Sequence, residues 1–275
     1  MRGHVQGIDH VVVLVRDLDK AQQAYARMGF TLTPRGFHTL GSQNHCLMFG
    51  QDYVELLAMP KPHPAMQSFS DFLAKGEGLG AIALATDDTS GLHASLAADG
   101  IAADAPLDFS RPVEGLGDAR FRILQLPPEA SPGCRVFACQ HFTREVVWRP
   151  EYQRHPNGAT EIAAVAVIAE DPEAAAASYG KLLAARPQKI EEGLLVQTGS
   201  APIALASRWK LGHRLHGVGL PLRSRPLVAA LFIRVADRAT AASVLRRNGL
   251  TPIALADASY AVSAQDAHGV AVVFG

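Results

Sequence analysis

One pattern recurs along this chain and limits the folds that it can adopt. A short apolar strand leads to an aspartate, a helix follows, and a glycine ends the helix. The aspartate before the helix and the glycine after it are twelve positions apart in three copies, from Asp17 to Gly29, from Asp88 to Gly100 and from Asp237 to Gly249. Aspartate caps the first turn of a helix, and glycine readily adopts the left-handed conformation at its end. Together with a fourth, less regular copy, the pattern indicates internal duplication.

The irregular copy is the third along the chain. Its strand covers Ile162–Asp171, and an Asp-Pro pair is typical of a helix start. Leu183 stands where the other copies have glycine. We therefore predict the same helix here, with a different residue at its end.

The first copy shows what one unit contains. A β-branched apolar strand is expected over Ile8–Val15, and apolar residues at helical spacing predict a helix over Asp19–Met28. Three further strands are expected over Phe30–Phe37, Asn44–Phe49 and Tyr53–Met59. Each unit is therefore predicted to be β-α-β-β-β.

The joint between the two pairs of units is expected at Arg149–Ala159, which has two prolines, an Asn-Gly pair and no apolar periodicity. A chain of 275 residues is long enough for two domains, each with its own core. We predict an α+β fold with one domain at 1–150 and a second at 160–275.

Composition excludes several kinds of partner. Basic and acidic residues number 26 each, so the chain lacks the basic surplus that nucleic-acid binding needs. No apolar run is long enough to span a membrane, and the N-terminus has no apolar signal core. Three cysteines form no CxxC pair, which is typical of reduced thiols. We expect a cytoplasmic protein.

Particular motifs resemble those of the vicinal oxygen chelate superfamily, and most closely its glyoxalase-like domain subgroup. They are GIDHVVVLVRDLDKA near the start, HTLGSQNH and DYVELL in the first unit, and CQHFTREVVWRPEYQRHPNGA at the end of the first domain. The resemblance implies tandem βαβββ units whose strands form an open cup around a metal. It also implies ligands on the first and last strands of each unit.

His10 and Glu55 occupy those two places in the first unit. Both lie within apolar strands, where an imidazole needs a partner and an unpaired carboxylate is costly to bury. The second unit has Ala81 where His10 stands, but its last strand offers His141. The resemblance thus implies a metal set of His10, Glu55 and His141. The alternative for His10 is a core histidine bonded to a carbonyl.

Several other residues are candidates for substrate binding. His38 and Asn44 belong to the subgroup motif, and the alternative is that they satisfy turn and edge-strand backbone groups. Arg120 and Arg122 share a face of a strand and can bind a carboxylate or phosphate, or form an exposed basic strand. His155 can fold over the cup as an acid or base, or belong to a rigid turn between the domains.

The second domain is expected to be a degenerate copy kept for structure, burial or dimer contacts, because its predicted strands carry no histidine. Its long loop, Ser207–Pro226, holds five basic residues and no acidic one: Arg208, Lys210, Arg214, Arg223 and Arg225. We expect a lid, an anion-binding flap, a subunit contact or a solvated connector.

The resemblance implies a metal-dependent enzyme of the lyase or isomerase type acting on a small oxygen-bearing metabolite. Glu55 would be both metal ligand and catalytic base, and the divalent cation would be Mg, Mn, Fe, Ni or Zn. The alternatives are a metal-free small-molecule binding or resistance protein and an Fe(II) extradiol-type dioxygenase. A homodimer is also expected.

Overall fold

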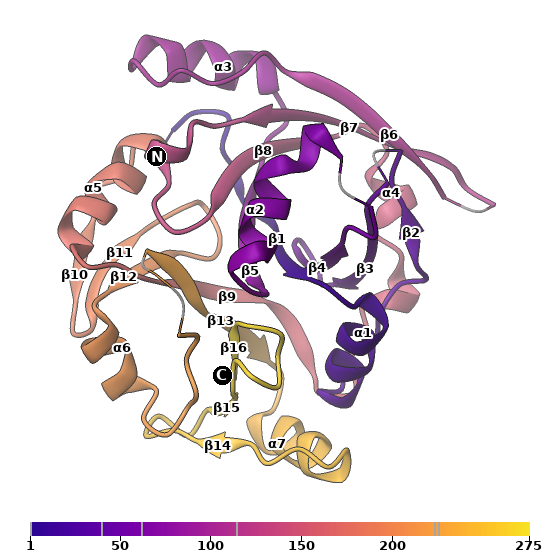
Figure 1. Cartoon of the computed structure of the whole chain (residues 1–275), viewed down its shortest axis with the longest axis vertical. Coiled ribbons are helices and arrows are strands. Elements are labelled where there is room, and N and C mark those ends of the chain that lie inside the picture. The colour runs from indigo at the N-terminus through magenta and orange to yellow at the C-terminus, as the bar shows by residue number, and fades with distance from the viewer. Residues whose placement is uncertain (1, 40, 62, 114, 223, 225) are drawn as a thin grey trace.

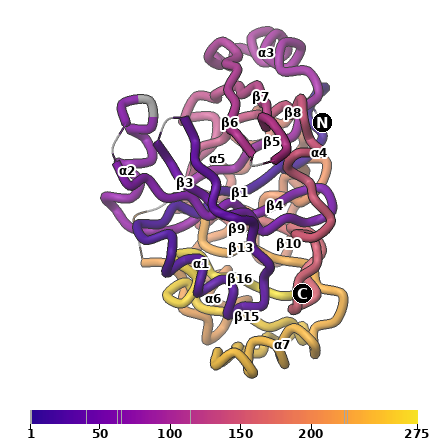
Figure 2. Tube along the Cα trace, turned by 90° about the vertical axis from the view of Figure 1, so that its right-hand side faces the viewer, coloured from indigo at the N-terminus to yellow at the C-terminus, as the bar shows by residue number. Residues whose placement is uncertain are grey.

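The computed structural model describes residues 2–39, 41–61, 63–113, 115–222, 224 and 226–275. They form two eight-stranded mixed sheets, each built from two βαβββ units (Figure 1). The α+β class and the tandem units predicted from the sequence are confirmed. In Figure 2 the C-terminal part of the chain, in orange and yellow, forms the lower end of the molecule.

The first sheet has the order β2-β3-β4-β1-β5-β8-β7-β6. Its strands are β1 (Gly7–Val15), β2 (Gly36–Phe37), β3 (Gln43–Met48), β4 (Tyr53–Ala58), β5 (Gly78–Ala85), β6 (Leu107–Val113), β7 (Gly117–Gln125) and β8 (Arg135–His141). In each unit the first and last strands are parallel neighbours, and the first strands of the two units pair antiparallel at the centre. The edge strands β2 and β6 lie near each other, so the sheet curves into a cup.

The second sheet repeats this order as β10-β11-β12-β9-β13-β16-β15-β14. Its strands are β9 (Ala159–Ile168), β10 (Gln188–Ile190), β11 (Gly193–Val196), β12 (Ile203–Ala206), β13 (Leu227–Val235), β14 (Ile253–Ala254), β15 (Tyr260–Val262) and β16 (Ala271–Phe274). Strand β8 ends at His141 and β9 begins at Ala159. The change of sheet therefore falls across the expected joint, and the exact division at 150 and 160 stays a prediction.

The helices begin and end where the repeat predicts. They are α1 (Leu18–Arg27), α3 (Thr89–Ala98), α5 (Pro172–Leu183) and α7 (Arg238–Arg247), and each is preceded by an aspartate whose side chain accepts from a backbone N–H of the first turn. Gly29, Gly100 and Gly249 have positive φ after three of them. In the irregular copy Ala184 takes the left-handed conformation, with φ of 45°. The missing glycine is thus replaced by a strained alanine.

The outer faces of the two central strand pairs pack against each other. Val11 and Val13 of β1 share one continuous core with Val165 of β9 and Leu231 of β13. Hydrogen bonds cross the joint as well, for example from the buried Tyr25 hydroxyl to the Ala267 carbonyl. The inner face of the first sheet is left free to line the cup.

Three segments differ from the sequence expectations. The strand expected over Phe30–Phe37 is regular only at Gly36–Phe37, and Pro34 explains this in part because it has no N–H for a ladder. The connection between the first two units contains η1 (Pro64–Met66) and α2 (Gln67–Lys75), which were not predicted. The loop expected after Ser207 contains a helix, α6 (Arg208–Arg214).

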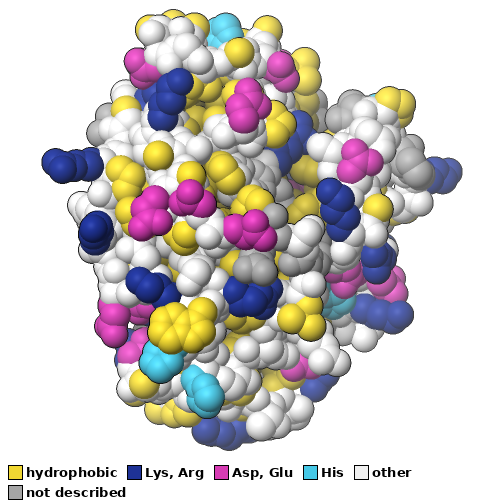
Figure 3. Space-filling model, turned by 60° about the vertical axis from the view of Figure 1, so that its left-hand side comes forward, with side chains coloured by type: hydrophobic (Ala, Val, Ile, Leu, Met, Phe, Trp, Pro, Cys, Tyr) yellow, Lys and Arg dark blue, Asp and Glu magenta, His cyan; other side chains and the backbone are white. Residues whose placement is uncertain are grey.

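Helix α6 folds because its apolar side can be buried. Leu211 and Leu215 pack on Ala166 and Ile168 of β9, while Trp209 remains 75% exposed on the other side. The predicted basic residues Arg223 and Arg225 lie outside the described residues. Figure 3 shows one face of the molecule, on which basic and acidic side chains are interspersed. Within the described ranges, no helix has the length and apolar character needed to cross a bilayer.

Candidate functional site

A β-bulge in β1 positions the first two polar residues of the site. The register between β1 and β5 shifts between Ile8 and His10, which leaves Asp9 as an extra residue. Ile8 and Val11 point into the core between the domains, while His10 lines the cup. Because of the bulge, Asp9 and His10 both serve the site although they are adjacent in the sequence.

The cup encloses a cavity of about 340 Å³ with two unlike walls. The first unit contributes the polar wall, formed by His10, His38, Asn44 and Glu55. The second unit contributes an apolar wall of Phe109, Phe121, Ile123 and Phe137, with the polar Asp104, Arg111, Gln125 and Arg135 beside it. The segments η1 and α2 cover one end with Met66 and Phe69. Such a cavity suits a small, largely apolar molecule that carries one polar group.

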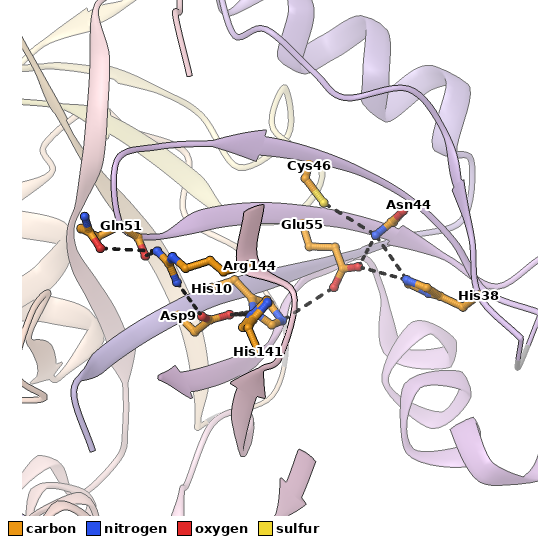
Figure 4. A network of polar contacts seen from close by, with 9 residues as sticks. All are labelled: Asp9, His10, His38, Asn44, Cys46, Gln51, Glu55, His141 and Arg144. Carbon is orange, nitrogen blue, oxygen red and sulfur yellow. Dashed lines mark hydrogen bonds and ion pairs between the residues drawn. The ribbon is translucent and has the colours of Figure 1, made fainter. Parts of the chain in front are cut away.

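Glu55 lies at the centre of the polar wall (Figure 4). Its side chain is buried, and Asn44 Nδ2 donates to its Oε1 at 2.6 Å. His10 Nε2 lies 3.9 Å from Oε2, and His38 Nε2 lies 3.9 Å from Oε1. Asn44 thus holds the carboxylate between two imidazoles.

The buried Asp9 carboxylate sets the orientation of His10. Its Oδ2 is 2.6 Å from His10 Nδ1 and 3.1 Å from His141 Nε2, and Arg144 Nη1 is 3.9 Å from Oδ1 (Figure 4). Burial alone raises the pKa of Asp9, but hydrogen bonds from His10 and His141 outweigh it and hold the pKa well below its usual value. The ionised carboxylate accepts the Nδ1 proton, so in neutral His10 the Nε2 atom facing Glu55 carries a lone pair.

His141 points toward Asp9. Its Nδ1 is buried and has no hydrogen-bond partner within the described part of the chain. The ring lies edge-on to Phe121 and Trp148, which fix its plane. The structure therefore brings His10 and Glu55 together, while His141 meets His10 through Asp9. As a ligand set, His10, Glu55 and His141 stay a prediction.

One other group of donor atoms is close enough to share an ion. Among the residues that the structure describes, Asp9, Cys139 and His141 each offer an atom within 4.8 Å of the others. Burial raises the pKa of the Cys139 thiol well above its usual value, and the nearby Asp9 and Glu55 carboxylates raise it further. A bound cation would itself favour the thiolate, so this group is a second candidate place for an ion.

The two units are unequal at the positions that face each other across the cup. In the register, Glu55 of β4 is opposite Val12 of β1, and Phe137 of β8 is opposite Ala83 of β5. Phe137 thus occupies the place in the second unit that Glu55 has in the first. With Ala81 in the place of His10, the second unit offers apolar side chains at both ligand positions.

The predicted His38 and Asn44 line the cavity, whereas the predicted arginines do not. His38 Nδ1 is 2.8 Å from Ser42 Oγ, and burial is the main cause that lowers its pKa. Arg122 forms a bidentate pair with Asp108 on the exposed side of β7. Arg120 is also exposed on β7. The cavity is lined instead by Arg111 and Arg135, which the sequence reasoning did not select.

His155 lies in the joint between the domains. Its Nδ1 accepts from the Thr31 N–H at 3.0 Å, and its Nε2 donates to the Met48 carbonyl at 2.9 Å. Its ring contacts Phe30 and Phe49. Both nitrogens are therefore used in fixing the joint, and the substrate-binding role predicted for His155 stays untested.

Comparison with known proteins agrees with this architecture. The model of the family described as "Glyoxalase-like domain" matches residues 8–183. This chain belongs to the glyoxalase-like domain family. The family is part of the vicinal oxygen chelate superfamily, whose members are often metal-dependent. A search of curated proteins gave no match.

Solved structures share the fold of this glyoxalase-like protein. A hypothetical protein from Staphylococcus aureus is 12% identical with a TM-score of 0.69, and 98% of each chain is covered. The Mn(II)-bound glyoxalase from Novosphingobium aromaticivorans is 12% identical with a TM-score of 0.60, covering 98% of this chain and 82% of that one. A mutant of 4-hydroxymandelate synthase from Streptomyces coelicolor is 14% identical with a TM-score of 0.59, covering 90% and 76%. Identities this low show the fold alone.

Proposed function

We propose that the cup is an enzyme site of the lyase or isomerase type for a small oxygen-bearing molecule, in which His10 and Glu55 hold a divalent cation. One observation carries this proposal: two electron-rich atoms, His10 Nε2 and Glu55 Oε2, face each other at 3.9 Å. Two ligands bound to one cation at about 2.1 Å lie roughly 3 to 4 Å apart. A cation between the two atoms would satisfy both lone pairs.

The environment of the pair supports a bound cation. Asp9 keeps the proton of His10 on Nδ1, as the partners of metal-bound histidines usually do. Asn44 occupies Glu55 Oε1 and leaves Oε2 for the ion. Mg, Mn, Fe, Ni and Zn remain the candidate ions, since all of them accept nitrogen and oxygen ligands.

A bound cation would polarise a carbonyl oxygen and stabilise the enolate formed from it. Within this scheme Glu55 is the base that takes a proton from the carbon next to that carbonyl. His38 Nε2, 3.9 Å from Glu55 Oε1, is placed to accept the proton from Glu55 or to return it. The apolar wall of the second unit would exclude water and hold the remainder of the substrate.

Metal content and solvent exchange test this proposal together. The protein is purified without chelator, and bound metal is measured for the wild type, His10→Ala, Glu55→Gln and a control, His213→Ala, in the second domain. We expect about one divalent ion per chain in the wild type and the control, and loss in the two site variants. Deuterium exchange into small ketones and 2-oxo acids, followed by NMR, should show the same dependence. Equal metal content in all four proteins would contradict the proposal.

A second function is favoured by a specific observation. Ala81 and Phe137 leave the second unit without ligands at the two positions that match His10 and Glu55, so the cup also suits a metal-free protein that binds small apolar molecules. Absence of metal together with ligand binding that His10→Ala leaves unchanged would support this function. An extradiol-type dioxygenase is less well supported. Its iron needs two histidines and one carboxylate around one ion, and His141, which would have to be the second histidine, is directed to Asp9.

A further inference from the structure

Arg111 lies where two cavities meet. It extends from the edge strand β6 and lines both the cup and a neighbouring cavity of about 500 Å³. Asn44 and Cys46 line both cavities as well. The two cavities thus share a wall beside Glu55, and a guanidinium forms part of that wall.

The other arginines of the two cavities have partners. In the second cavity Arg35 pairs with Asp19, and Arg149 pairs with Glu151. In the cup, Arg135 donates to Gln125 Oε1 at 3.0 Å and to Ser68 Oγ at 2.9 Å.

Arg111 differs from these arginines. Across the described ranges its guanidinium has no hydrogen bond or ion pair, while its backbone belongs to the ladder between β6 and β7 and the residue is partly buried. A guanidinium that faces a cavity with none of its donors bonded to the protein is free to bind an acceptor on a ligand.

The guanidinium of Arg111 lies close to the polar wall. Gly36 permits the close approach: a Cβ there would lie 3.5 Å from Arg111 Nη1 and only 2.2 Å from Asn44 Oδ1. The guanidinium therefore lies within a few ångströms of the Asn44 side chain that holds Glu55.

We propose that Arg111 binds the carboxylate of the substrate, which is then a small aryl or alkyl carboxylic acid whose apolar part lies against the phenylalanine wall. The proposal rests on the proposed function of the cup. A planar guanidinium binds a carboxylate through two parallel hydrogen bonds. Asp104 faces the charge of Arg135, the other arginine of the cup, so Arg111 supplies the positive charge that balances a monoanion. A phosphate dianion would add a second negative charge beside Glu55.

Matched acids and amides test this proposal. Phenylacetate with phenylacetamide, and hexanoate with hexanamide, are titrated into the wild-type protein in EDTA and followed by saturation-transfer NMR. We expect each acid to bind about tenfold or more tightly than its amide. Arg111→Met should reduce this ratio to about one, because the acid loses more affinity than its amide. Arg111→Lys should retain part of it, and Arg247→Met in the second domain should match the wild type.

The outcomes separate this proposal from that of the cup. An acid preference that survives in Arg111→Met, or its absence in the wild type, would overturn the role of Arg111. A preference that appears only when Mn²⁺ replaces EDTA, and that Arg111→Met does not change, would place the carboxylate on the metal and would also overturn it. Neither result affects the metal dependence of His10 and Glu55. Conversely, loss of metal binding to the cup would leave the comparison of acid and amide intact.

Discussion

Replacement of Asp9 by asparagine is expected to weaken both the fold and the metal site. The carboxylate accepts hydrogen bonds from His10 and His141 while fully buried. A hydrogen bond to a charged group contributes about 1.5 to 3 kcal/mol. An asparagine oxygen in the place of Oδ2 can keep both bonds, but they lose the negative charge, and the amide in the place of Oδ1 would face the Arg144 guanidinium. We therefore expect Asp9→Asn to lower the free energy of unfolding by roughly 2 to 3 kcal/mol.

The pH dependence of this loss follows from the lowered pKa of Asp9. Stabilisation by such a carboxylate is complete above its unfolded value of 3.8 and is lost as pH falls toward the folded pKa. Urea unfolding followed by circular dichroism should thus give a loss at pH 5 at least as large as at pH 7. Affinity for Mn²⁺ should fall about 10- to 100-fold, because Asp9 orients His10. The exposed Asp108→Asn is the control. A loss below about 0.5 kcal/mol at pH 7, or one that vanishes at pH 5, would refute the reasoning.

Three further changes have distinct expected results. In Gly36→Ala the new Cβ would lie 2.2 Å from Asn44 Oδ1 and displace the side chain that holds Glu55. The affinity for Mn²⁺, measured by electron paramagnetic resonance, should therefore fall about tenfold. The control Gly50→Ala has open space around its Cβ and should bind Mn²⁺ as the wild type does. Burial raises the pKa of Asp52 to about 7, so the charge of Asp52 destabilises the fold as pH rises from 3.8 through 7. Asp52→Asn should therefore stabilise the protein by roughly 1 to 3 kcal/mol at pH 8 and by much less at pH 4. An equal effect at both pH values would contradict this. His155→Gln should lower the free energy of unfolding, measured in urea, by roughly 2 to 3 kcal/mol and leave the affinity for Mn²⁺ unchanged. Loss of the metal site in this variant would show that His155 acts in the cup.

Local chemistry made most of the fold predictable. The aspartate caps and the glycines with positive φ are properties of single helix ends, and they recur wherever the repeat places them. Short elements without periodicity were not predictable in this way. The helix α2 and the helix α6 depend on apolar surfaces supplied by distant strands.

The candidate site was predictable only in part. His10 and Glu55 are polar residues within apolar strands, a contrast that the sequence shows directly. Asp9 was missed because simple alternation puts it on the face opposite His10, and the bulge depends on pairing with β5. Arg111 was missed because no strand was predicted over β6, although the apolar Leu107, Phe109 and Val113 alternate along it on the face that also carries Arg111. That face enters the cup only when the sheet curves.

Anomalous diffraction from crystals soaked in Mn²⁺ tests the central claim most directly. We predict one strong anomalous peak within about 2.3 Å of both His10 Nε2 and Glu55 Oε2, and no peak there in crystals of Glu55→Gln. A peak at Asp9, Cys139 and His141 instead, or an empty cup at saturating Mn²⁺, would contradict the claim.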